Sequence, residues 1–188
     1  MRGLIGKKIG MTRVFNSIGH SIPVTVLEVG PCYVIQVKTF KNDGYDAVQL
    51  GFLDSKEKHV TKPLAGHFKK SNVKPTKVLA EFKSVPEFEY KPGQIFNVSL
   101  FSEGDFVTVS GKSKGRGFSG TVKKYSFSTQ RKTHGQGDTH RHVGSIGAAS
   151  DPSRVFPGKK MPGRYGNKTV SVKDLEVINV NESKNQLI

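Results

Sequence analysis

The sequence predicts a mainly β protein: a small closed or half-closed antiparallel barrel that carries a long basic extension. Short runs rich in β-branched residues recur outside residues 111–168, and turn signals separate them, which is typical of small barrels. Only one stretch has the residue spacing of a helix. Residues 111–168 are too cationic and too poor in aliphatic side chains to fill a core of their own. A length of 188 residues fits one domain with an appendage.

Two β-branched runs, Ile22–Val29 and Cys32–Thr39, open the predicted sheet. Glycine and proline at positions 30 and 31 separate them. In the second run Tyr33, Ile35 and Val37 are expected to share one face of the strand, with Gln36 and Lys38 on the other.

The next strand returns after a turn and completes a predicted hairpin. The tripeptide Asn-Asp-Gly at residues 42–44 is a strong turn signal. Tyr45–Phe52 follows it, with Val48, Leu50 and Phe52 in phase on one face.

Residues Thr61–Asn72 predict the one short helix. Thr61 is expected to cap its N-terminus, and Pro63 is tolerated in the first turn. Leu64 and Phe68 lie one helical turn apart and therefore share a face.

Further strands are predicted at Lys77–Phe82, Ile95–Leu100 and Phe106–Ser110, and a last one within residues 169–180. In the last run the apolar residues change phase, which predicts a turn or bulge at residues 173–174. The strands thus lie on both sides of residues 111–168, so this stretch leaves the folded part after one strand and returns to begin another.

The basic segment, Gly111–Lys168, concentrates the charge of the chain. It holds 13 lysines and arginines against Asp138 and Asp151, a net charge of +11 out of +15 for the whole chain. It also contains 11 of the 21 glycines, which let the backbone approach other groups closely. Residues 1–110 with 168–188 are therefore expected to form the β-barrel base, and residues 111–167 an extension that a polyanion, nucleic acid, would order.

The side chains of the extension have the chemistry of RNA binding. Arginines bind phosphates through two parallel hydrogen bonds or stack on bases, lysines supply point charges, and histidines and aromatic rings contact phosphates and unstacked bases. The candidate RNA-binding residues are Lys112, Lys114, Arg116, Phe118, Lys123, Lys124, Arg131, Lys132, His134, His140, Arg141, His142, Arg154, Lys159, Lys160, Arg164 and Lys168.

Other readings of the extension have weaker support. Residues 115–120 match G-x-G-x-x-G, but a dinucleotide site needs a long helix after the last glycine and then a second strand. His134, His140 and His142 with Asp138 are a possible metal cluster, although no cysteine is near and Arg141 separates two of the histidines. No serine or cysteine has the context of a nucleophile. A disordered basic linker remains a further alternative.

Other sequence features bear on the class of protein and on its cellular compartment. Cys32 is the only cysteine, so a disulfide within the chain is impossible, and a buried thiol in a reducing compartment is expected. No apolar run is long enough to span a membrane, and no signal core is visible near the N-terminus. We therefore expect no membrane partner, no small-molecule substrate, no cofactor, no resident metal and no catalysis.

Four motifs carry a resemblance to a known family. They are GLIGKKIGMTRVF at Gly3–Phe15, GKSKGRGFSGTVKK at Gly111–Lys124, GSIG at Gly144–Gly147 and VFPGKKMPG at Val155–Gly163. In this order, and along nearly the whole chain, they resemble the third protein of the large ribosomal subunit, in its bacterial or organellar form. The first motif starts almost at residue 1, which leaves no room for a transit peptide; a cytoplasmic ribosome is expected, and an organellar one stays open.

The resemblance implies a fold and a role. The fold would be a six-stranded barrel with a long extension that threads between rRNA helices toward the peptidyl transferase centre. The role would be structural: direct binding of large-subunit rRNA, early assembly, and contact with neighbouring ribosomal proteins. The alternatives are a general RNA chaperone or a nucleic-acid-compacting protein, although no repeated basic face is visible, and a nucleotide- or metal-dependent enzyme.

The resemblance also places the tip of the extension near Gly144–Pro152, which contains no cation. Many bacterial members carry a glutamine, methylated on its side-chain amide, directly after the GSIG element. Here that residue is Ala148, so the modification does not carry over. The expected tip residues are Gly144, Ser145, Ile146, Gly147 and Ala148.

Overall fold

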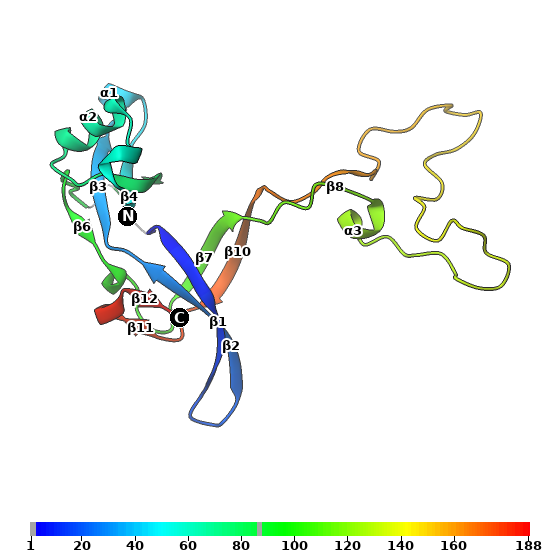
Figure 1. The fold of residues 1–188 in the computed structure, drawn as a ribbon, viewed down its shortest axis with the longest axis horizontal. Coiled ribbons are helices and arrows are strands. Elements are labelled where there is room, and N and C mark those ends of the chain that lie inside the picture. The colour runs from blue at the N-terminus through cyan, green and yellow to red at the C-terminus, as the bar shows by residue number, and fades with distance from the viewer. Residues whose placement is uncertain (1–2, 86–87) are drawn as a thin grey trace. The chain divides into compact units, whose positions relative to one another are not determined.

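The computed structural model describes residues 3–85 and 88–188, and the chain divides into two compact units (Figure 1). Unit 1 consists of Met1–Val107 with Asp174–Ile188, and unit 2 of Thr108–Lys173. Unit 1 carries most of the strands, and each unit is described by itself. No helix among the described residues is long and apolar enough to cross a membrane.

The first sheet of unit 1 has the order β1-β2-β12-β11. A long hairpin of β1 (Gly6–Phe15) and β2 (Ser21–Val29) pairs antiparallel, and the short strands β12 (Gln186–Leu187) and β11 (Val180–Asn181) continue the sheet. The strand predicted at residues 22–29 is confirmed as β2. Sequence reasoning missed β1, since most of its side chains are exposed and no buried alternation marks it.

The second sheet of unit 1 has the order β5-β4-β3-β6. The predicted hairpin is confirmed, because β3 (Cys32–Lys38) pairs antiparallel with β4 (Ala47–Asp54). Their connection contains a four-residue helix, α1 (Phe40–Asp43), which ends at a glycine with φ of 79°. The predicted strand at residues 77–82 is confirmed as β5 (Thr76–Lys83).

The prediction that Tyr33, Ile35 and Val37 share one face of β3 is wrong. Val34 is fully buried and Ile35 is nearly so, whereas Tyr33 and Val37 are only half-buried. The ladder between β3 and β4 shifts register between Val34 and Gln36, and this bulge changes the phase of the side chains. A strict alternation rule could not anticipate an extra residue in one strand.

The apolar face predicted for β4 is confirmed. Val48, Leu50 and Phe52 are at most 2% exposed and form a core cluster with Cys32, Val34 and Tyr90. The thiol of Cys32 is buried as expected; it donates to the carbonyl oxygen of Ile5 at 3.5 Å, and burial raises its pKa.

A second cluster lies elsewhere in unit 1 and joins distant parts of the chain. It contains Val29, Val98, Val177 and Leu187, of which Val98 is fully buried. Leu4 packs against both clusters. The segment after the basic segment therefore contributes directly to the core of unit 1.

The short helix is confirmed as α2 (Lys62–Lys70), with Pro63 in its first turn. Phe68 is 2% exposed and anchors the helix, while Leu64 on the same face is 43% exposed. Thr61 occupies the N-cap position, but its side chain makes no capping hydrogen bond, so that part of the prediction is wrong.

The remaining strands are shorter or more irregular than predicted. The run at residues 95–100 is a strand only in β6 (Ile95–Phe96) and continues as a 3-10 helix, Val98–Leu100. Two further 3-10 helices span Glu57–His59 and Glu182–Lys184. β7 (Phe106–Lys112) forms a two-stranded sheet with β10 (Thr169–Glu176). The irregularity predicted in β10 corresponds to a positive φ of 56° at residue 174.

The mainly β class is confirmed, but a six-stranded barrel is not seen in the described part of the chain. Its strands form two four-stranded and two two-stranded sheets, none of them closed. The outer strands are β1 and β11 in one four-stranded sheet and β5 and β6 in the other. Of these, β6 and β11 have only two residues each, which is too short for a continuous ladder.

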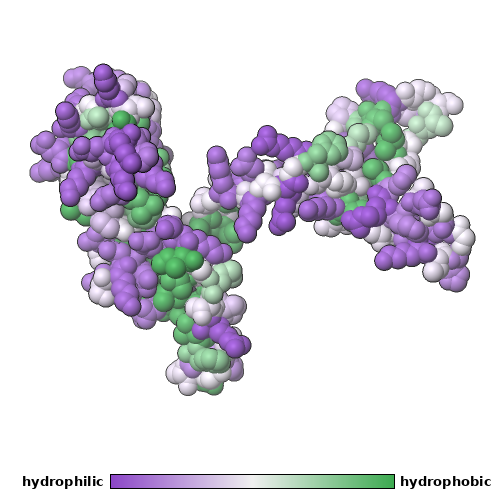
Figure 2. Space-filling view, viewed as in Figure 1, coloured by the Kyte–Doolittle hydropathy of each residue, from purple (hydrophilic) through white to green (hydrophobic). Residues whose placement is uncertain are grey.

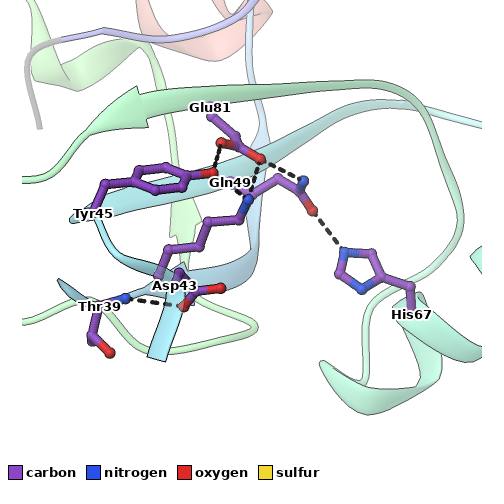
Figure 3. A network of polar contacts seen from close by, with 7 residues as sticks. Thr39, Asp43, Tyr45, Gln49, His67 and Glu81 are labelled. Carbon is purple, nitrogen blue, oxygen red and sulfur yellow. Dashed lines mark hydrogen bonds and ion pairs between the residues drawn. The ribbon is translucent and has the colours of Figure 1, made fainter. Parts of the chain in front are cut away.

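A polar network crosses the surface of the second sheet (Figure 3). The ammonium of Lys38 lies 2.8 Å from Glu81 and 2.5 Å from the hydroxyl of Tyr45, which itself donates to Glu81 at 2.8 Å. Gln49 donates to Glu81 at 3.3 Å and accepts from the ring of His67 at 2.7 Å. The hydrogen bonds from Lys38 and then Tyr45 lower the pKa of Glu81, and the same contacts raise the pKa of Lys38.

A lowered carboxyl pKa predicts a pH-dependent contribution to stability. Glu81 stabilises the fold above the ordinary carboxyl pKa, and this stabilisation is lost as pH falls through its lowered folded-state pKa. Glu81→Gln is therefore expected to lower the urea unfolding midpoint slightly at neutral pH, and this difference from wild type should shrink as pH falls through the lowered pKa of Glu81.

The matched control is Glu89→Gln. Glu89 pairs with Lys91 at 3.8 Å, and both side chains are more than 70% exposed, so this variant is expected to match wild type at neutral and at acidic pH. Equal effects of the two substitutions at neutral pH would contradict a specific role for the network.

Candidate nucleic-acid interface

Backbone hydrogen bonds tie together the two ends of the basic segment in unit 2. The N–H of Ser113 donates to the carbonyl of Lys168 at 3.0 Å, and that of Asn167 donates to Ser113 at 3.1 Å. The N–H of Arg116 donates to the carbonyl of Tyr165 at 2.9 Å. The outgoing residues 113–116 and the returning residues 165–168 are thus hydrogen-bonded to each other; this paired stretch is called the root of the segment.

The root continues into a small ladder of β8 (Phe118–Ser119) and β9 (Gly163–Arg164), which pair antiparallel. Close pairing of the two chain segments in the root requires a glycine at position 166. Gly166 has a φ of 72°, and a Cβ there would collide with the backbone carbonyl of Lys114. The expectation that glycines of this segment allow close backbone approach is confirmed at this position.

The structure excludes a dinucleotide fold at residues 115–120. After the last glycine the chain forms only α3 (Thr121–Tyr125), a helix of five residues that ends at Ser126 with φ of 57°. The next strand is β9, far along the chain, so neither the long helix nor the second strand of a dinucleotide site follows.

Nearly all cations of the basic segment are exposed, and none of them has an ion-pair partner among the described residues. Twelve of its 13 lysines and arginines are exposed, and Lys124 is half-buried. Among the described residues, both ion pairs lie in unit 1, at Lys38–Glu81 and Lys91–Glu89. Figure 2 shows mostly hydrophilic residues on the two paired ends of the segment, which join the sheet of β7 and β10 to β8. Hydrophobic residues gather near α3. The segment therefore presents uncompensated positive charge that attracts a polyanion.

Aromatic rings lie among these cations. The ammonium groups of Lys124 and Lys160 lie 5.0 and 5.8 Å from the centre of the Tyr125 ring, and the guanidinium of Arg154 lies 5.3 Å from that of Phe156. Phe118 is 81% exposed. Its ring is thus a free flat surface beside positive charge, as base stacking requires.

The loop of residues 130–140 is held by its own side chains. Gln136 donates to Gln130 at 2.7 Å and to Thr139 at 2.8 Å. Nδ1 of His140 lies 2.9 Å from the carbonyl oxygen of Arg131; since a carbonyl only accepts, Nδ1 carries the proton. The two glutamines were not among the candidate residues, because no sequence spacing marks a loop closed by amides.

The possible metal cluster is not assembled in the structure. His134 and His142 are exposed, His140 is half-buried against the backbone, and no group of three potential ligands occurs among the described residues.

The expected tip is exposed and satisfies its polar groups internally. The hydroxyl of Ser145 donates to the carbonyl of Gly147 at 3.0 Å, and that of Ser153 donates to the carbonyl of Ser150 at 2.5 Å. Ile146 is 44% exposed. The tip, residues 144–152, thus carries no cation and one anion, Asp151, in contrast to the cationic chain on either side of it.

Comparison with known proteins gives one consistent match. The family model described as Ribosomal protein L3 matches residues 89–187. The chain is 50% identical over 189 residues to the large ribosomal subunit protein uL3 of Thermotoga petrophila, covering 100% of this chain and 89% of the relative. It is 48% identical over 185 residues to uL3 of Petrotoga mobilis, covering 98% of this chain and 86% of the relative.

A β-rich unit joined to a segment of exposed cations has the features of a protein that binds a polyanion. The comparisons narrow this class to the structural proteins of the large ribosomal subunit. The chain belongs to the ribosomal protein L3 family, and the resemblance found in its four motifs is confirmed.

Proposed function

We propose that this structural constituent of the large ribosomal subunit binds large-subunit rRNA directly, through residues 111–167, with residues 1–110 and 168–188 as its folded base. The observation that carries the proposal is the set of 11 exposed cations in residues 111–167, none of which has an ion-pair partner among the described residues. A surface of this kind is stabilised by neutralising phosphates and releasing their counterions. The candidate residues named for the extension are the proposed contacts.

The proposal includes an early role in assembly. A segment of net charge +11 with few apolar side chains gains order mainly from its RNA partner, so it is suited to bind rRNA before the surrounding subunit is complete. The base would then contact neighbouring large-subunit proteins, in ribosomes of the cytoplasm. A six-stranded barrel in the folded base stays a prediction from the family resemblance.

The test of direct binding compares two lysine pairs in the full-length chain. Lys159 and Lys160 are exposed in unit 2, and Lys7 and Lys8 are exposed on β1 of unit 1. Replacing Lys159 and Lys160 with alanine is expected to lower the salt slope of large-subunit rRNA binding by about one to two units, since each neutralised phosphate contributes about 0.9.

The Lys7 and Lys8 double variant removes the same charge from unit 1 and is the control. It is expected to retain the wild-type slope. Filter binding over a salt series measures both variants. A slope that falls equally in both, or only in the control, would contradict binding through residues 111–167.

The tip is proposed to reach toward the peptidyl transferase centre. Small, neutral residues gain little Coulomb energy but fit where a backbone passes close to packed RNA. Gly147→Arg or Ser145→Tyr is therefore expected to leave rRNA affinity within about threefold of wild type, a change of less than about 1 kcal/mol. Either change should alter peptide-bond formation, or sensitivity to drugs that bind at that centre.

Reconstituted ribosomes that carry these variants provide the measurement. The control is Ser128→Tyr, an exposed serine outside the tip, which is expected to change neither readout. Tip variants that assemble normally and match wild type in peptidyl transfer and drug response would show that the tip lies away from the centre.

A further inference from the structure

A hollow of about 300 Å³ lies on unit 2 beside β8 and α3. Its lining includes an aromatic ring, Phe118, the aliphatic side chain of Val122 and three cations, Arg116, Lys123 and Arg141. No carboxylate lines it. A flat apolar surface and several positive charges thus meet within one small space.

Backbone pairing holds one wall of this hollow in place. Phe118 pairs with Arg164 in the ladder of β8 and β9. The turn before it is closed by the hydroxyl of Ser119, 5% exposed, which donates to the carbonyl of Arg116 at 3.2 Å. Because both neighbours of the ring are fixed, the Phe118 side chain is presented to solvent by a preorganised backbone.

One of the three cations that line the hollow, Arg141, comes from a later part of the chain. Arg141 directly follows the loop of residues 130–140, whose ends are joined by the N–H of Gln130 donating to the carbonyl of His140 at 3.0 Å. The ring of His140 also contacts the carbonyl of Arg131. The closed loop therefore positions Arg141 beside a turn that lies much earlier in the chain.

We infer that this hollow binds one unpaired nucleotide of a single-stranded RNA segment, with the base stacked on Phe118 and its phosphate held by Arg116, Lys123 and Arg141. The inference rests on the proposed function, and it names the kind of RNA element recognised at this position. A volume of about 300 Å³ lies at the lower end of ligand pockets and is too small for a base pair and its two backbones. A base in a continuous duplex has no free face, so stacking on the ring selects an unpaired base.

The absence of tryptophan from the chain makes a direct test possible. Phe118→Trp introduces the only tryptophan of the full-length protein, at the proposed stacking surface. Its emission is expected to be quenched when a short single-stranded RNA binds, and to be unaffected by a duplex of the same sequence. Phe106→Trp is the matched control, since Phe106 is 72% exposed on β7 and does not line the hollow; its emission should not change with either RNA.

A second variant measures the energetic contribution without a fluorophore. Phe118→Ala is expected to weaken single-stranded RNA binding about 5- to 140-fold, the range for loss of one stacked base, with an unchanged salt slope. Its affinity for the duplex should stay at the wild-type value. Phe118→Tyr, which keeps the aromatic face, should restore single-strand binding.

The outcomes separate this inference from the proposed function. Salt-dependent rRNA binding without quenching in the Phe118→Trp protein, or equal losses for single strand and duplex in Phe118→Ala, overturns the nucleotide site alone. Quenching of the introduced fluorophore by mononucleotides at the same concentration as by the single strand would identify a free-nucleotide site and overturn the RNA assignment. Loss of all RNA binding by the wild-type chain would overturn the proposed function itself.

Discussion

The affinity of the chain for large-subunit rRNA is expected to fall about 10³- to 10⁵-fold between 50 and 200 mM salt. This is the range for proteins that neutralise about six to ten phosphates, and the basic segment offers 12 exposed cations without carboxylate partners. Binding releases counterions condensed on the RNA, and added salt opposes that release. The effect is therefore electrostatic in origin and independent of the rRNA sequence.

Filter binding with purified chain and rRNA at several salt concentrations gives the slope of log affinity against log salt. Repeating the series with a neutral osmolyte in place of salt is the control, and affinity should then stay nearly constant. A nearly flat salt response would point to a small, mostly apolar interface and would contradict an extension that binds through phosphates.

Local patterns were sufficient to predict much of unit 1. The hairpin of β3 and β4 follows from a tripeptide turn signal and from the alternation that buries Val48, Leu50 and Phe52. The helix α2 follows from its proline and from the spacing of Leu64 and Phe68. Each of these signals acts over a few residues, so it can be read without knowledge of the tertiary structure.

Features that depend on distant pairing were missed or mistaken. β1 is largely exposed and is a strand because β2 supplies its hydrogen bonds. The bulge in β3 at Ile35 reflects its register with β4, and no residue type announces it. A barrel was expected from the spacing of the short strands and from the family resemblance, but no closed sheet is seen among the described residues. Two-residue strands such as β6 and β11 are not visible as periodic patterns.

For the candidate interface, too, local features were predictable from the sequence and features that depend on distant contacts were not. Charge and exposure were predictable, because a dense cationic segment cannot bury its side chains. The convergence of Arg116, Phe118 and Arg141 was not, since Arg141 depends on a loop closed by Gln130, Gln136 and Thr139. The spacing of these polar residues in the sequence does not predict that they hydrogen-bond to one another.

The second large effect concerns hydrogen exchange in the free protein. Residues 126–162 contain no helix or strand, and their described part makes two backbone–backbone hydrogen bonds, from Gln130 to His140 and from Lys159 to Phe156. Most of their amides have no backbone partner and are expected to exchange fast, whereas the amide of Gln130, which donates to His140 and closes the loop of residues 130–140, should exchange more slowly. The amides of β3 and β4, which pair with each other and carry the fully buried Leu50, should be strongly protected.

Exchange measured on the same chain, free and bound to large-subunit rRNA, tests most directly whether the extension is the rRNA-binding element. At a free rRNA concentration about 100 times Kd, binding stabilises the bound form by about 2.7 kcal/mol, so exchange across residues 111–167 should slow about 100-fold. Protection that appears only in unit 1, or amides of residues 126–162 already as protected in the free chain as those of Cys32–Phe52, would contradict the account.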